Sequence, residues 1–355
     1  MAKRHMVTRL WLIALLVLTV GLVAPPHTTC AQESTTEQPE LSVDLASNDE
    51  GYSAVLYDNT NGLPTSEAND IVETKEGFIW IGSYSGLIRY DGNTFERMGS
   101  TTGVASVVSL FVDSTDRLWV GTNDSGVAVL EDGEFRFITM EDGLTSASVR
   151  AVAEDGIGNI FVATTEGITL VSQDGRIVPM HDPRVDESYV RDLLPDSKGV
   201  LYGVTMEGEV FSIKGEALRD FYTSEQLGIP SVISVLPDPN RDGYVYLGTK
   251  ESSVYYGNLE DGFANPKRID VSPLSSIKSL ALFGDRLWIC ADNGIGFMEG
   301  DHVHQVQNVP LNNSIDHVAQ DYEGNLWFTS SRQGVMKIVP TSSQTSSSAM
   351  ACRRP

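Results

Sequence analysis

The chain has 355 residues, and its 48 aspartates and glutamates outnumber its 25 lysines and arginines, which gives a formal net charge of −23. This acidity argues against a nucleic-acid partner, because binding to a phosphate backbone requires clustered positive charge. Hydrophobic residues make up 41% of the chain, which is typical of a soluble folded protein and excludes a disordered chain or a multi-span membrane protein.

Residues 1–31 have the pattern of a secretory signal peptide. Three basic residues precede an apolar run over residues 10–24, and small residues follow up to Ala31. An uncleaved membrane anchor is the alternative, although the run is shorter than the roughly 20 residues that span a bilayer. Both interpretations place the body of the protein outside the cytoplasm, in the periplasm or at the cell surface. Residues 32–50 are polar and acidic, and we expect them to form a disordered linker.

From residue 51 to residue 340 the chain repeats one unit seven times. Each unit has a short apolar run around one aromatic residue, and successive aromatics lie 39, 42, 41, 44, 42 and 39 residues apart. Repetition at this period is typical of β-propellers, in which each unit forms one blade. The aromatics that we expect to anchor the seven blades are Trp80, Trp119, Phe161, Tyr202, Tyr246, Trp288 and Trp327.

Each unit also contains the turns that four short strands need. An acidic turn such as Asp113 to Asp116 precedes the aromatic run, and a second turn such as Asp132-Gly133 follows a third run of β-prone residues. Turns of Asp and Gly between such segments indicate hairpins. The sequence therefore predicts an all-β fold, a seven-bladed β-propeller with four-stranded antiparallel blades.

The seventh unit ends after its third strand. Residues 52–64 resemble residues 135–144, which contain the fourth strand of the second unit and the turn after it. We therefore expect the N-terminal strand of the body to complete the last blade, which would remove an exposed sheet edge. Residues 341–355 are rich in serine and threonine and carry no structural period, so we expect a disordered tail.

Patterns for catalysis and metal binding are sparse. His302 and His304 would lie on one face of a strand, but a solvated strand face is the simpler interpretation because too few further ligands stand nearby. The segment from Asp238 to Gly243 begins like a calcium loop, yet its twelfth position is Thr249 instead of a bidentate glutamate. Three cysteines cannot form a disulfide framework. The sequence thus predicts no cofactor and no metal, and it predicts that the domain is not an enzyme.

Seven loops join the second strands to the third strands of the units, and they differ in sequence while their flanks repeat. In a propeller these loops surround the axis at one face, so a variable polar ring there can carry ligand specificity. The mixture of polar, aromatic and charged side chains suits a small polar ligand or an oligosaccharide, and solvated hairpin tips are the plain alternative. The candidate ligand-binding residues are Tyr84, Asn123, Asp124, Glu166, Glu207, Lys250, Asn293 and Arg332.

The first unit resembles the two-component regulator propeller repeat. The resemblance rests on residues 61–64, 71–82 and 86–95, and the second and seventh units repeat the pattern almost as well. This family supplies extracytoplasmic sensor domains of bacterial transmembrane signalling proteins, and a membrane helix with a histidine kinase or diguanylate cyclase commonly follows the propeller. The resemblance therefore implies a ligand-binding sensor domain.

No apolar span follows residue 340. We interpret the chain as a sensor propeller without its transmembrane and effector part, where a longer form would carry the kinase or cyclase. An autonomous secreted propeller that binds a glycan or a protein is the alternative, and a polysaccharide hydrolase or lyase is a further one. The expected partner is a small polar ligand or an oligosaccharide. A homodimer through the propeller stays open, and the membrane would be reached only through an uncleaved leader or a missing C-terminal helix.

Overall fold

The computed structural model describes residues 41–43 and 52–340 of the chain. The expected signal peptide, the expected tail and most of the expected linker lie outside the described residues. Within the linker stretch, Leu41–Val43 form strand β1, which pairs with β2 (Tyr52–Tyr57). The sequence predicts disorder there, but the free edge of β2 offers unpaired backbone groups on which a further strand can form.

The described residues form seven antiparallel sheets of four strands each, to one of which β1 is added, which confirms the predicted seven-bladed propeller. The first strands of the blades are β3 (Asp70–Glu73), β7 (Val107–Val112), β11 (Val149–Glu154), β15 (Val190–Pro195), β19 (Val232–Pro237), β23 (Ile277–Phe283) and β27 (Ile315–Gln320). The second strands are β4 (Ile79–Ser83), β8 (Leu118–Thr122), β12 (Ile160–Thr164), β16 (Leu201–Thr205), β20 (Tyr244–Thr249), β24 (Arg286–Ala291) and β28 (Leu326–Ser330).

The outer half of each blade follows the same order. The third strands are β5 (Gly86–Tyr90), β9 (Val127–Glu131), β13 (Gly167–Val171), β17 (Val210–Lys214), β21 (Ser253–Asn258), β25 (Gly294–Glu299) and β29 (Gly334–Pro340). The fourth strands are β6 (Phe95–Arg97), β10 (Glu134–Ile138), β14 (Ile177–Pro179), β18 (Ala217–Tyr222), β22 (Lys267–Asp270), β26 (His302–Gln305) and, in the last blade, β2.

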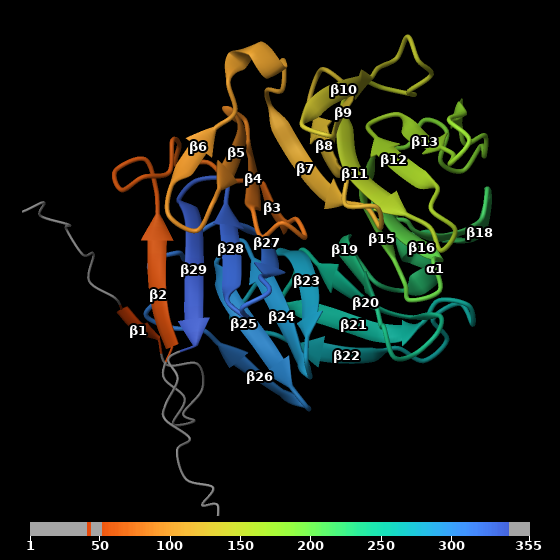
Figure 1. Ribbon diagram of the computed structural model, residues 1–355. Coiled ribbons are helices and arrows are strands. Elements are labelled where there is room, and N and C mark those ends of the chain that lie inside the picture. Colours follow the sequence, from red (N-terminus) through yellow and green to blue (C-terminus); the bar gives the residue numbers. More distant parts are fainter. Residues whose placement is uncertain (1–40, 44–51, 341–355) are drawn as a thin grey trace, which may run out of the picture. The chain divides into compact units, whose positions relative to one another are not determined.

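The first strands surround the central axis. Each contacts the first strand of the next blade, and the series closes because β27 contacts β3; Figure 1 shows the resulting ring. Two short helical segments lie between strands, namely the 3₁₀ turn η1 (Ser100–Thr102) and the helix α1 (Ser224–Leu227). No helix within 41–43 and 52–340 is long and apolar enough to cross a membrane.

The ring is closed by the N-terminal strand, as the sequence predicts. β2 pairs with β29 over six residues, from Tyr52 opposite Pro340 to Tyr57 opposite Val335. In Figure 1 the red–orange β2 therefore lies beside the blue β29, although the two strands come from opposite ends of the described chain. The seventh blade thus gains the strand that its own unit lacks.

The second strands are apolar because blades pack against both of their faces. Every residue of β4, β8, β12, β16 and β28 is buried. All seven predicted anchor aromatics lie in second strands, and all are buried except Tyr246, which is half-buried. The small residue two positions after the aromatic has a packing reason: a Cβ on Gly121 would lie 2.2 Å from Ser109 Oγ and 2.8 Å from Val149 Cγ1. Glycine there lets the next blade's first strand approach closely.

The acidic turn before the second strand holds the anchor tryptophan of two blades. Asp113 accepts a 2.8 Å hydrogen bond from Trp119 Nε1, and Asp321 accepts one of the same length from Trp327 Nε1. Both carboxylates also accept backbone N–H groups of their own turns. In the first blade this position is Thr74, and the buried Nε1 of Trp80 has no hydrogen-bond partner among the described residues. The repeat therefore uses a carboxylate to satisfy a buried indole donor in the second and seventh blades.

Candidate functional site

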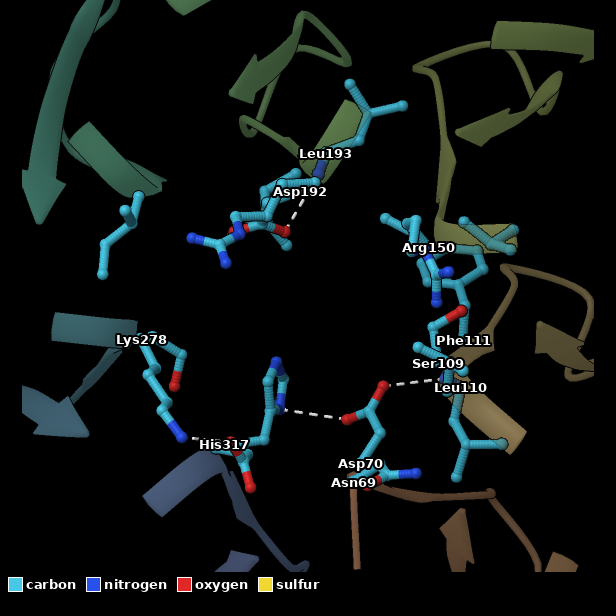
Figure 2. Close-up of a pocket in the computed structure, with 18 of the residues that line it drawn as sticks. Asn69, Asp70, Ser109, Leu110, Phe111, Arg150, Asp192, Leu193, Lys278 and His317 are labelled. Atoms are coloured by element: carbon cyan, nitrogen blue, oxygen red, sulfur yellow. Dashed lines mark hydrogen bonds and ion pairs between the residues drawn. The ribbon is translucent and has the colours of Figure 1, made fainter. Parts of the chain in front are cut away.

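A cavity of about 560 Å³ lies on the central axis. Every blade contributes at least one residue of its first strand to the lining, and Lys250, in the loop between β20 and β21, joins them. Figure 2 shows these side chains arranged around the open middle of the ring. We call this cavity the central channel.

The channel side chains are aimed by a repeated irregularity of the backbone. In six blades the pairing between the first and second strands shifts register just after the first residue of the first strand. A β-bulge of this kind leaves one residue unpaired and redirects its side chain. The six bulge residues all line the channel: Val108, Arg150, Arg191, Ile233, Lys278 and Asp316. Four of the six are charged, so the bulges bring charge to the axis.

One cation of the channel is neutralised by its own surroundings. Lys278 Nζ lies 2.8 Å from Asp316 Oδ1 and 3.1 Å from Asp292 Oδ1. It also donates a 2.6 Å hydrogen bond to Ser314 Oγ. These contacts join the sixth blade to the seventh and leave Lys278 without free hydrogen-bonding capacity.

Three further cations have no carboxylate partner among the described residues. Arg150 donates to two neutral oxygens, Asn123 Oδ1 at 2.9 Å and Ser148 Oγ at 2.7 Å, and its guanidinium lies over the ring of Tyr189. Its Nε is buried and has no partner in the described part of the chain. Arg191 and Lys250 make no side-chain hydrogen bond or ion pair with any described residue. The three cations come from consecutive blades, the third, fourth and fifth.

On the other side of the channel, His317 faces Asp70. His317 Nδ1 lies 3.1 Å from Asp70 Oδ1, which is an ion-pair distance, although the two groups are not aligned for a hydrogen bond. Asp70 is buried, and its Oδ2 accepts a 2.7 Å hydrogen bond from the backbone N–H of Leu110 in the next blade. Burial raises the pKa of the Asp70 carboxyl, against the opposing effects of His317 and of the backbone donors.

Asp192 is the third carboxyl of the channel, and Figure 2 shows it across the open middle from His317. Its Oδ1 accepts a 2.9 Å hydrogen bond from the backbone N–H of Leu193. Burial deep in the channel raises the pKa of Asp192, and the charge on Asp70 acts in the same direction, whereas His317 and the backbone donors oppose the shift. The proton is therefore held more tightly by Asp192 in the folded chain than in the unfolded chain.

We expect Asp192→Asn to stabilise the protein relative to wild type by an amount that grows as the pH rises above 3.8. An aspartate with a raised pKa contributes its full stability below its unfolded pKa of 3.8 and loses it as the pH rises through the folded value. The amide does not titrate. Denaturant unfolding of both proteins across this range measures the difference.

The control for this prediction is Asp142→Asn. The pKa of Asp142 is lowered, chiefly by the backbone N–H of Thr139, so its carboxylate stabilises the fold above pH 3.8 and this contribution is lost in acid. The two variants should therefore show pH trends of opposite sign. A difference for Asp192→Asn that does not change with pH would contradict the raised pKa.

The predicted loop residues are spread around the ring, and the structure brings few of them to the channel. Lys250 lines the channel, and Asn123 of the second blade accepts a hydrogen bond from Arg150. Glu166 instead lines a separate cavity with His181, and Asn293 bonds the backbone of Ser275. The other predicted residues, all exposed and none lining the channel, are Tyr84, Asp124, Glu207 and Arg332.

The variable loops thus predicted a binding site at the rim of the propeller. Most charged residues of the channel instead belong to the first strands. The signal for these residues is present in the sequence. The residue after the first Val or Ile of the first strand is apolar in two blades, as Val108 and Ile233, but charged in four, as Arg150, Arg191, Lys278 and Asp316. An alignment of the first strands at this position could have revealed the channel residues.

Within residues 41–43 and 52–340, no group of three or more His, Cys, Asp or Glu side chains could hold a metal ion. Cys290 is buried, and burial raises the pKa of its thiol to about 12. A buried thiol of this kind is a packing residue and not a nucleophile or ligand.

Comparison with known proteins identifies the repeats. Residues 62–85 and 103–124, in the first and second blades, match the two component regulator propeller family. The first two blades therefore carry two-component regulator propeller repeats. The matched segments contain the second strands of these two blades with their anchors Trp80 and Trp119, as the resemblance predicts.

Solved structures share the propeller fold of this chain. The streptogramin B lyase structure is 15% identical, with a TM-score of 0.66, over 82% of this chain and 98% of that chain. The extracellular domain of a hybrid two component system from B. thetaiotaomicron is 20% identical, with a TM-score of 0.66, over 81% of this chain and 42% of that chain. Virginiamycin B lyase from Staphylococcus aureus is 13% identical, with a TM-score of 0.66, over 82% and 100% of the two chains. At these identities the likeness concerns the fold. No curated protein matches the sequence significantly.

Proposed function

We propose that this propeller is the extracytoplasmic, ligand-binding sensor domain of a bacterial two-component or cyclic-dinucleotide signalling protein. The observation that carries the proposal is a charged central channel in a propeller of two-component regulator repeats. The repeats form the scaffold, and the bulge residues that differ between blades supply the site.

The channel lining contains polar groups that the described chain does not satisfy. Arg191 and Lys250 line the channel and make no side-chain hydrogen bond or ion pair with any described residue. Charged groups without a partner in a cavity can be completed by the polar groups of a bound molecule, which supports a ligand site here. A small polar ligand or an oligosaccharide unit fits a cavity of this size.

The sensing role places the domain outside the cytoplasm, with residues 1–31 as the export signal. A longer form would carry the membrane helix and the kinase or cyclase, and ligand binding in the channel would be the signal that it transmits. Mass measurement of the exported protein tests the first part, because cleavage after Ala31 would leave a chain that begins at Gln32.

The binding proposal is tested by screening the purified protein against small metabolites and oligosaccharides by thermal shift. We expect a saturable rise in melting temperature with one class of compound, and loss of that rise in Arg191→Gln. The matched control is Arg268→Gln, which alters an exposed arginine on the outer strand β22 and should leave the shift unchanged. No shift with any compound, or an equal shift in Arg191→Gln, would contradict a ligand site in the channel.

A second candidate function is chemical conversion of the bound ligand. The observation that favours it is the pairing of His317 with Asp70, since a carboxylate beside an imidazole is a common arrangement of a general base. Lyases share this fold, although at 15% identity or less. Product analysis of the binding compound decides between the candidates: turnover that is lost in His317→Ala would make the domain an enzyme, and unchanged compound supports the sensor.

A further inference from the structure

We infer that the ligand of the central channel is a small hydroxylated molecule with an oxyanion group, a carboxylate, phosphate or sulfate, held by Arg150, Arg191 and Lys250. The inference rests on the proposed ligand-binding function and adds the chemical class of the ligand.

The balance of charge in the channel is opposite to that of the whole chain. Acidic side chains outnumber basic ones by 48 to 25 in the whole chain, yet four Lys and Arg side chains line the channel against three carboxyls, which belong to Asp70, Asp192 and Asp316. The local concentration of positive charge in so acidic a protein would attract an anion into the channel and repel it from the remaining surface.

Three of the four channel cations have no anionic partner within the channel. Lys278 and Asp316 form a pair with each other, and Asp70 faces His317. Arg150 and Arg191 are half-buried, and neither they nor Lys250 form an ion pair with any described residue. A partly buried cation without an anionic partner is costly, and a bound oxyanion would remove this cost.

The three cations lie next to one another in the ring. They come from the third, fourth and fifth blades, so they form one continuous arc of the channel wall. Asp70 and His317 lie on the first and seventh blades, whereas Asp192 lies within the arc, beside Arg191 on the fourth blade. A molecule in the channel can therefore direct an anionic end toward Arg150, Arg191 and Lys250 and hydroxyl groups toward Asp70 and His317 on the other side, with Asp192 as a further acceptor.

Asp192 and Asp70 indicate that the ligand also carries hydroxyl groups. Carboxylates accept hydrogen bonds from hydroxyl groups, and His317 can donate or accept. An anion without hydroxyl groups would leave these acceptors unused and would be repelled by the two carboxylates. The site therefore favours an anion that also carries donors over a simple inorganic ion.

The test compares matched probes by isothermal titration calorimetry with the full chain. D-Glucuronate, glucose 6-phosphate and glucose 6-sulfate share the sugar ring of D-glucose but differ in their anionic group. We expect at least one of the three to bind ten-fold or more tightly than glucose, and to bind more weakly as the salt concentration rises. Sodium sulfate and sodium phosphate alone should bind more weakly than that probe, because they offer no sugar hydroxyls.

Two variants should change the affinity for the anionic probe in opposite directions. Arg191→Gln should weaken binding of the anionic probe by ten-fold or more, because the charge-assisted hydrogen bond becomes a neutral one. Asp192→Asn should strengthen it, because the amide keeps an oxygen that accepts from a hydroxyl group while a neighbouring negative charge is removed. Lys214→Ala changes an exposed lysine at the end of β17 and serves as the control, with unchanged affinity expected.

The outcomes separate this inference from the proposed function. Binding of glucose or another neutral compound in the channel, as strong as that of the anions, would overturn the anionic class and leave the sensor proposal standing. Absence of binding by all the sugar anions at millimolar concentration would also overturn the anionic class. Equal binding by sulfate alone would overturn the requirement for hydroxyl groups. Failure of both the neutral and the anionic compounds of the wider screen would overturn the ligand-binding function itself.

Discussion

Removal of β2 by starting the chain at residue 58 should lower the melting temperature by about 10 °C or more. The deletion removes the strand that pairs with β29 and the side chains that β2 packs against the core. Tyr57 contacts Trp327 and Phe95, with ring centroids 6.2 and 5.0 Å apart, and Tyr52 OH accepts a hydrogen bond from Arg286. Loss of a few buried side chains and a covered sheet edge costs several kcal/mol.

The matched control for this deletion is a chain that begins at residue 44, which lacks β1 and keeps β2. It should melt near the wild-type temperature, because β1 is a three-residue addition to an already closed blade. A synthetic peptide of residues 50–60, added to the chain that starts at residue 58, should restore part of the lost stability. Equal melting temperatures for the two truncations would show that β2 does not close the ring in solution.

Substitution of the turn carboxylates should also be strongly destabilising. We expect Asp321→Ala to lower the free energy of unfolding by about 3 kcal/mol, because Trp327 Nε1 is left buried without an acceptor and Asn325 Nδ2 keeps only Glu323 as an acceptor. Asp113→Ala should have an effect of similar size for the same reason, and it also frees Arg117. Denaturant unfolding of each variant measures the loss.

Thr74→Ala is the control at the same position of the first blade, where no carboxylate serves the indole of Trp80. Its cost should stay below about 1 kcal/mol. The Asp113 variant gives a second check by pH. Burial tends to raise the pKa of Asp113, but hydrogen bonds from Trp119, Arg117 and Thr115 outweigh it, so the net pKa is lowered. Its contribution is present above pH 3.8 and is lost as the pH falls, so wild type and Asp113→Ala should converge in acid.

Much of the architecture could be predicted because it is encoded locally. Each unit carries its own turn residues and its own buried aromatic, so strand order and blade number follow from the period alone. Ring closure could also be predicted, since the sequence of residues 52–64 resembles that of a fourth strand. The strand β1 could not, because only the edge of a finished β2 gives Leu41–Val43 a partner.

The candidate site was likewise predictable from the sequence only in part. Sequence patterns predict a propeller with variable loops at one face, and they include Lys250 among the candidate binding residues. That Arg150, Arg191 and Lys250 share a cavity with Asp70 and His317 is visible only in the folded chain. Consecutive first strands lie about 40 residues apart in the chain. Each of them shows only an ordinary local alternation of apolar and polar residues. Closure of the ring brings seven such strands to one axis, and the bulge in six of them directs one side chain toward it, which is charged in four.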